Sequence, residues 1–229
     1  MTAPPNQRDG GVRCLVFDVD DTLYLERDYV RSGFWAVDRW ARVHLGVAGV
    51  FERAWRRFES GHRRTIFDEV VAELSLDPAS IGTMVEVYRS HDPEISLLAD
   101  SMAALETAAS NGAPIAVVTD GPAASQWGKV RALGLDRWAS LTVVTADLGP
   151  GRGKPHPAAF ELVQDRLGHC GPDCAYVADN PAKDFAAPAA LGWRTVRVRR
   201  VGSLHEHQPS GPLVGAELAD LVDLAGALR

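Results

Sequence analysis

Five short apolar runs that alternate with helical patterns constrain the fold of this chain more than any other feature. The runs lie at 12–17, 114–119, 141–145, 174–178 and 194–198. Short apolar runs bounded by turn-forming or acidic residues are typical of strands buried on both faces of a parallel sheet. Helical patterns at 98–111, 122–133, 157–167 and 183–191 are each followed by a glycine, where helices commonly end. We therefore predict an α/β fold with a doubly wound, Rossmann-like parallel sheet.

The segment between the first and second apolar runs breaks this alternation. It contains no convincing strand and has helical patterns at 26–44, 49–58, 65–74 and 80–91. We expect residues 25–91 to form a small helical bundle inserted into a core made of residues 11–24 and 92–229, with residues 1–10 as a flexible N-terminal tail. A last apolar pattern at 216–228 predicts a C-terminal helix.

The segment LVFDVDDTL at 15–23 carries three carboxylates, Asp18, Asp20 and Asp21, onto the turn after the first predicted strand. Crowded carboxylates repel one another and raise each other's pKa unless a cation or hydrogen-bond donors stabilise their charge. Mg²⁺ suits such a place because it prefers a few carboxylates together with water and phosphate oxygens. An acidic turn or a helix N-cap would explain this pattern alone equally well.

Three further segments follow other predicted strands, so they are expected at the same edge of the sheet, where ligands bind in such folds. They are VVTDG at 117–121, GKP at 153–155 and VADNPAKD at 177–184. In this order, the patterns DxDxT, hhhTDG, KP and hhADNPxxD resemble the four motifs of the haloacid dehalogenase (HAD) superfamily. The sequence is therefore similar to HAD superfamily hydrolases of the phosphatase branch with a helical C1 cap.

The resemblance implies a role for each matched residue. Asp18 matches the nucleophile that forms an aspartyl-phosphate, and Asp20 matches the general acid that protonates the leaving group and then activates water. Thr119 and Lys154 match the hydroxyl and the ammonium that bind the transferring phosphoryl group, so both count as catalytic and as substrate-binding residues. Asp120 and Gly121 complete the expected substrate-binding set, although many members of the superfamily carry Asn where this chain has Asp120.

The resemblance also implies a Mg²⁺ cofactor. Asp18, Asp179 and Asp184 match carboxylates of the metal site, and Asp20 matches the residue whose backbone carbonyl binds the metal. The insertion at 25–91 stands where C1 caps stand, and such a cap excludes water and selects the leaving group. We interpret the basic residues of the insertion as a solvated face; they are Arg53, Arg56, Arg57, His62, Arg63 and Arg64.

Two features near the C-terminus are interpreted as structural rather than functional. Arg197, Arg199 and Arg200 cluster at the end of the last predicted strand and are expected on an exposed edge. The pair His205-x-His207 lacks further ligands, so we expect an ordinary loop there rather than a metal site.

The function that follows is hydrolysis of a phosphomonoester of a small metabolite, with sugar phosphates, nucleotides and biosynthetic intermediates as candidates. A phosphosugar mutase of the same superfamily and a non-catalytic protein that binds a phosphorylated ligand stay open as alternatives. Dehalogenation is disfavoured because that branch lacks the acid that matches Asp20. Phosphonate hydrolysis is disfavoured because residues 25–91 contain no lysine for a Schiff base, and a receiver module would be about half this length.

Composition and charge exclude other classes. A net charge of −6 argues against a protein that binds nucleic acid or an anionic membrane by neutralising phosphates. The first ten residues lack the apolar core of a signal peptide and no apolar run could span a membrane, so we expect a cytoplasmic protein whose partner is its small-molecule substrate. Three cysteines are too few for a disulfide framework, and we expect structural thiols. The sequence does not indicate an oligomeric state.

Overall fold

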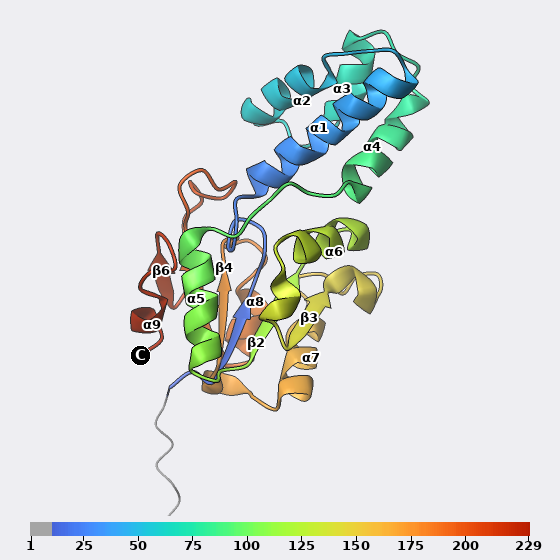
Figure 1. Ribbon diagram of the computed structural model, residues 1–229. Helices are drawn as coiled ribbons and strands as arrows, with labels where there is room; N and C mark the ends of the chain where they lie inside the picture. The colour runs from blue at the N-terminus through green and yellow to red at the C-terminus, as the bar shows by residue number, and fades with distance from the viewer. Residues whose placement is uncertain (1–10) are drawn as a thin grey trace, which may run out of the picture.

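The computed structural model describes residues 11–229, and its core is a parallel sheet of six strands in the order β3-β2-β1-β4-β5-β6 (Figure 1). The strands are β1 (Cys14–Phe17), β2 (Ile115–Thr119), β3 (Leu141–Val144), β4 (Cys174–Ala178), β5 (Arg194–Val198) and β6 (Ala216–Leu218). Every pairing in the sheet is parallel. The predicted α/β fold with a doubly wound sheet is thus confirmed. The expectation for residues 1–10 lies outside the described residues.

The central strands bury side chains on both faces, which explains their continuous apolar sequences. In β1, Leu15 and Phe17 pack on one face with α5 (Ala99–Ser110) and α6 (Ala123–Ala132), whereas Cys14 and Val16 pack on the other. That second face is covered by α7 (Ala158–Leu167) and α8 (Ala186–Ala190). Successive side chains of a strand point to opposite faces, so one apolar run serves both layers.

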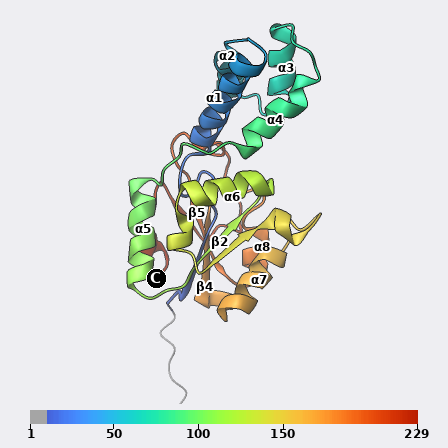
Figure 2. The same ribbon diagram turned by 45° about the vertical axis from the view of Figure 1, so that its right-hand side comes forward.

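Four helices between β1 and α5 form a separate unit, which Figures 1 and 2 show beyond one end of the sheet. They are α1 (Glu26–His44), α2 (Val50–Glu59), α3 (Ile66–Glu73) and α4 (Ser80–Ser90), called here the helical unit. Its apolar side chains form a cluster of their own. In α1, Val30, Phe34, Val37 and Ala41 recur on one helical face and are buried in this cluster.

A buried acid joins the first two helices of this unit. The Asp38 carboxylate on α1 accepts hydrogen bonds from the backbone N–H groups of Gly49, Val50 and Phe51 at 2.8 to 3.2 Å. These are N–H groups that the start of α2 leaves without a partner inside the helix. Charge-assisted bonds of this kind offset the desolvation of the carboxylate, so Asp38 stabilises the start of α2.

The C-terminal segment differs from its prediction. The helix expected at 216–228 is wrong, because residues 216–218 form β6 and only Leu224–Ala227 form a short helix, α9. Strand β6 pairs with β5 and satisfies backbone groups that would otherwise be left at the sheet edge. For the same reason β5 is not an exposed edge, and the expected exposure of Arg197 and Arg200 is also wrong, since both are buried.

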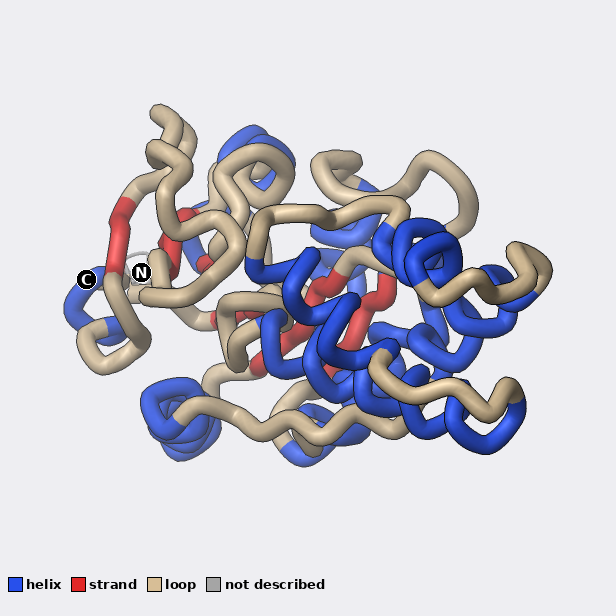
Figure 3. Tube along the Cα trace, turned by 90° about the horizontal axis from the view of Figure 1, so that it is seen from above, coloured by secondary structure: helices blue, strands red, loops and turns tan. Residues whose placement is uncertain are grey.

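Seen from above, the strands lie beneath helices and long connecting loops (Figure 3). Within residues 11–229, no helix combines the length and the apolar composition that a membrane crossing needs.

Candidate active site

The side chains singled out by their motifs follow the carboxyl ends of neighbouring strands. Asp18 and Asp20 follow β1, Thr119 ends β2, and Asp179 follows β4. Strands β2, β1 and β4 are adjacent in the sheet, and parallel strands end at the same edge, so these residues converge there. Lys154 reaches the same place from the loop between β3 and α7.

Lys154 is the centre of a buried charge cluster. Its Nζ lies 2.7 Å from an oxygen of Asp18, 2.7 Å from an oxygen of Asp184 and 3.0 Å from the hydroxyl of Tyr176, and its side chain is fully buried. Burial alone would lower the pKa of Lys154, but the two carboxylates hold the pKa well above its ordinary value. Burial raises the pKa of Asp18 to about 6, against the opposing charge of Lys154. The ammonium therefore stays charged next to the carboxylate of Asp18.

Three buried carboxylates fit a hard cation. Asp18, Asp179 and Asp184 each place one oxygen within 4.8 Å of the others. The oxygen Oδ2 of Asp179 is buried and has no hydrogen-bond partner among residues 11–229. Burial, together with the charges of Asp18 and Asp184, raises the pKa of Asp179 well above its ordinary value. An unpartnered, crowded carboxylate is what a divalent cation would stabilise, and oxygen donors are the ligands that Mg²⁺ prefers.

Asp20 lines the same cavity as Asp18 and Asp179, and its carboxylate contacts α6. Lys129 Nζ lies 2.7 and 2.8 Å from the two oxygens of Asp20, and Gln126 and Tyr24 also donate hydrogen bonds to this carboxylate. Lys129 is itself buried and lies 4.3 Å from the centre of the Tyr29 ring. Burial would raise the pKa of Asp20, but Lys129 and these hydrogen bonds hold the pKa below its ordinary value.

The sequence analysis missed Gln126 and Lys129. Their spacing of three residues on a helix places both on one face, and this helix follows the strand that ends in Thr119. Lys129 is also one of only three lysines in the chain. These signals were present, but nothing local in the sequence links residue 129 to residue 20.

The turn after β2 has a defined geometry. The Thr119 hydroxyl donates to Gln126 Oε1 at 2.7 Å. Gly121 has a φ of 149°, and a Cβ there would lie 2.7 Å from Gln126 Nε2, so this position requires glycine. The carboxylate of Asp120 accepts hydrogen bonds from the backbone N–H of Lys154, at 3.2 Å, and from the Thr145 hydroxyl. Asp120 thus braces the loop that carries Lys154.

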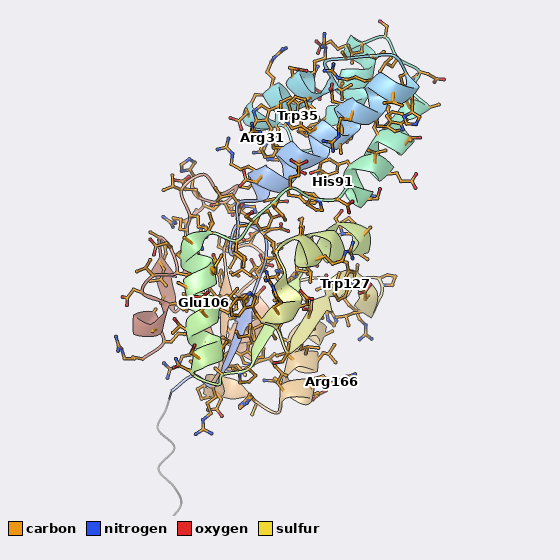
Figure 4. All side chains as sticks on the ribbon, viewed as in Figure 1. Arg31, Trp35, His91, Glu106, Trp127 and Arg166 are labelled. Carbon is orange, nitrogen blue, oxygen red and sulfur yellow. The ribbon has the colours of Figure 1, made fainter. Side chains whose placement is uncertain are left out.

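A cavity of about 300 Å³ opens above these residues. Its floor includes Asp18, Asp20 and Asp179, while Glu26 of α1 and Arg89 of α4 line it from the helical unit. Figure 4 shows His91 just after α4, where the chain returns from the helical unit toward the core. The cavity therefore lies between the sheet edge and the helical unit. Neither Glu26 nor Arg89 was expected at the site.

Loop 202–215 also reaches the cavity, through His205. The His205 ring lies 2.9 Å from the Asn180 side chain, and buried Arg197 donates to the backbone carbonyls of His205 and Asp179 at 2.8 and 3.0 Å. Arg197 therefore holds this loop against the segment that contains Asp179. Of the described residues, only Asp18, Asp179 and Asp184 form a group with ligand atoms close enough for a metal ion, so His205 and His207 do not form a second one.

The basic residues of the helical unit make mainly local contacts. Arg53 and Arg57 form ion pairs with Glu69 and Glu73 across α2 and α3. Arg63 lies over the Phe58 ring at 4.2 Å and donates to the Phe58 carbonyl. These contacts tie Arg53, Arg57 and Arg63 to neighbouring residues of the helical unit, and the solvated face stays a prediction.

Comparisons with known proteins identify the family of this chain. The family model of haloacid dehalogenase-like hydrolases matches residues 12–192. The chain is 27% identical over 209 residues to the glyceraldehyde 3-phosphate phosphatase of Methanopyrus kandleri, covering 86% of this chain and 88% of that protein. It is 28% identical over 224 residues to the phosphoserine phosphatase of Thermus thermophilus, covering 82% of this chain and 89% of that protein.

A solved structure shows the same fold. The magnesium-bound HAD-hydrolase YfnB of Bacillus subtilis superposes with a TM-score of 0.67 at 18% identity, covering 96% of this chain and 99% of that chain. At this identity the likeness shows the fold alone.

Proposed function

The chain belongs to the haloacid dehalogenase-like hydrolase family and is a phosphatase, and from this premise we propose that it is a Mg²⁺-dependent phosphomonoesterase that acts on a small phosphorylated metabolite. The observation that carries the proposal is the contact between Lys154 and Asp18 at the floor of a cavity, with Asp20 beside it. Asp18 serves as the nucleophile, and residues 25–91 serve as the cap over the core of residues 11–24 and 92–229.

In the first half of the reaction, a carboxylate oxygen of Asp18 attacks phosphorus and the bond from phosphorus to the ester oxygen breaks. The product is an aspartyl-phosphate on Asp18. Asp20, which is ionised beside Lys129, takes the proton of the substrate's phosphate monoanion and passes it to the leaving oxygen. Lys154 stabilises the negative charge on the transferring phosphoryl group, and the Thr119 hydroxyl adds a second donor when it turns from Gln126 Oε1 toward a phosphoryl oxygen. The Lys154 ammonium is effective because Asp18 and Asp184 already fix its position.

In the second half, water attacks phosphorus and gives its proton to Asp20, and the bond from phosphorus to the Asp18 oxygen breaks. Asp20 returns this proton to the departing inorganic phosphate, so both carboxyl groups end ionised, as they began. Lys129, Gln126 and Tyr24 orient Asp20 in both halves through their hydrogen bonds to its carboxylate. The helical unit excludes bulk water from the cavity during the transfer.

Asp18, Asp179 and Asp184, together with the backbone carbonyl of Asp20, would hold Mg²⁺. When bound, this ion neutralises charge on the phosphoryl oxygens and fixes their position relative to Asp18. The unpartnered Oδ2 of Asp179 supports this assignment.

The test is phosphate release from a panel of phosphorylated sugars, nucleotides, trioses and amino acids, measured with Mg²⁺ and with a chelator. Asp18→Asn should abolish release while the far-ultraviolet circular dichroism is unchanged. Asp165→Asn, which changes an exposed carboxylate on α7, is the matched control and should keep full activity. Release that persists in Asp18→Asn would refute the mechanism, and a folded wild-type protein that releases phosphate from no compound would refute the phosphatase proposal.

A further inference from the structure

A second cavity adjoins the candidate active site. Its volume is about 450 Å³ and it lies within the helical unit, lined in part by Phe34, Phe58 and Phe67. Three residues line both cavities: Glu26, Tyr88 and Arg89. These three residues therefore surround the space where the leaving group of a substrate on Asp18 would lie.

Glu26 is an acid without a partner at this place. Its backbone N–H donates to Asp21 at 2.8 Å, but its carboxyl group forms no ion pair or hydrogen bond with any residue of the described chain. The nearby lysines are engaged elsewhere, Lys129 with Asp20 and Lys183 with Asp120. Burial, reinforced by the charge of Asp20, raises the pKa of Glu26 to about 8. A half-buried acid of this kind is stabilised by a cation that enters the cavity.

Arg89 brings the opposite charge to the same wall. It lies in the last turn of α4, and within residues 11–229 its guanidinium has no ion-pair or hydrogen-bond partner. The Ser125 hydroxyl of α6 donates to the backbone carbonyl of Arg89 at 3.2 Å, and the Tyr29 hydroxyl donates to that of Tyr88 at 3.4 Å. These bonds fix the end of α4 against α1 and the core, so the base of the Arg89 side chain is held at the cavity.

Glu26 and Arg89 do not form an ion pair with each other, although both line the same two cavities. An exposed guanidinium and a half-buried acid that ionises when a cation binds, held apart on one wall, fit a ligand that carries the complementary charges. A guanidinium binds a carboxylate through paired hydrogen bonds, and a carboxylate binds an ammonium through a charge-assisted one.

On the basis of the proposed function, we propose that the leaving group is zwitterionic, with its ammonium at Glu26 and its carboxylate at Arg89. The substrate class is then an O-phosphorylated amino acid. Trioses and other neutral polyols carry neither charge, so they would leave both side chains without partners. A zwitterionic leaving group forms charge-assisted hydrogen bonds with both side chains that these compounds cannot form, so the site should favour the zwitterion.

The experiment measures kcat/KM for four substrates that differ by one group at a time. O-Phosphoserine carries both charges, 3-phosphoglycerate replaces the ammonium by a hydroxyl, O-phosphoethanolamine lacks the carboxylate, and glycerol 3-phosphate lacks both charges. The wild-type enzyme should prefer O-phosphoserine to each of the others by roughly tenfold or more, the factor expected when a charged hydrogen bond is lost.

Two variants should each remove one part of the preference for O-phosphoserine. Glu26→Gln should lower the ratio of kcat/KM for O-phosphoserine to that for 3-phosphoglycerate by roughly tenfold. Arg89→Met should instead lower the ratio for O-phosphoserine to O-phosphoethanolamine by a similar factor. Glu106→Gln on α5 and Arg166→Met on α7 change exposed residues of the same types outside the cavities and should leave every ratio unchanged (Figure 4).

The outcomes separate this inference from the function on which it rests. Mg²⁺-dependent release that requires Asp18 but shows no preference for O-phosphoserine overturns the inference and leaves the phosphatase proposal standing. Variants that lower all four substrates equally also overturn the inference. No release from any substrate by a folded protein overturns both.

Discussion

Replacing Lys129 by methionine tests whether a lysine 109 positions from Asp20 in the sequence holds this general acid in place. The substitution keeps the length and most of the apolar stem of the side chain but removes the ammonium that contacts both Asp20 oxygens, at 2.7 and 2.8 Å. The Lys129 side chain is 3% exposed and that of Asp20 is 18% exposed. The variant therefore leaves a largely buried carboxylate without its cation.

The expected loss of stability follows from this burial. Removing one partner of a buried ion pair costs about 3–5 kcal/mol. Asp20 keeps its hydrogen bonds from Gln126 and Tyr24 and is partly exposed, so the lower end, about 3 kcal/mol, applies. In a chain of this size each kcal/mol shifts the thermal midpoint by about 2–4 °C, which predicts a decrease of about 6–12 °C.

Lys183→Met is the matched control. Lys183 lies 3.7 Å from Asp120 and the two side chains are 35% and 25% exposed. A solvated pair of this kind contributes about 0–1 kcal/mol, so the thermal midpoint should change little. Equal midpoints for Lys129→Met and Lys183→Met would refute the structural part of the argument.

A separate measurement tests the catalytic role of Lys129. If Lys129 positions the general acid, Lys129→Met should lose up to roughly the 10²–10⁴-fold that general acid catalysis contributes for alkyl phosphates, whose alkoxide must be protonated as it leaves. The loss should be much smaller for p-nitrophenyl phosphate, because its phenolate leaves without a proton. Equal losses of kcat with both leaving groups would show that Lys129 supports only the fold.

Three other substitutions and a titration give further tests. Asp20→Asn should lower kcat for alkyl phosphates by roughly 10²-fold or more, since an amide cannot transfer the proton; a rate equal to wild type in a phosphate-release assay would contradict its role. The pKa of Glu26 is raised from 4.5 to about 8 in the folded protein, so its ionisation makes wild type lose stability between these pH values. Glu26→Gln should therefore gain stability relative to wild type from pH 5 to pH 9, and a difference in thermal midpoint that stays constant across this range would contradict the argument. Titrated Mg²⁺ should raise the thermal midpoint of wild type but not that of Asp179→Asn, and equal shifts would place the ion elsewhere.

The amino-acid sequence was sufficient to predict the α/β fold and to indicate which residues meet at the strand ends. The apolar runs identify the strands locally, and parallel strands bring their carboxyl ends to one edge whatever the loops between them do. Asp18, Thr119 and Asp179 could therefore be expected together from the sequence. The helical pattern at 26–44 likewise matches the observed α1, because a long amphipathic face is a strong local signal.

Which side chains complete the site depends on how distant elements pack together. Lys129 lies 109 positions from Asp20 in the sequence, and its contact depends on how α6 packs across the sheet edge. Glu26 and Arg89 belong to different helices and share a wall only because the helical unit folds over the core. The periodicity of a segment shows which face of a helix or strand is buried. It does not show which residues pack against that face.

The same reason explains the C-terminus. Its apolar pattern at 216–228 suggested a helix, but β5 offered a row of unpaired backbone N–H and C=O groups that residues 216–218 could satisfy. That pairing buried Arg197, which then fixed loop 202–215 and His205 beside the site. A strand edge exists only after the sheet has formed, so this choice belonged to the folded structure and not to the local sequence.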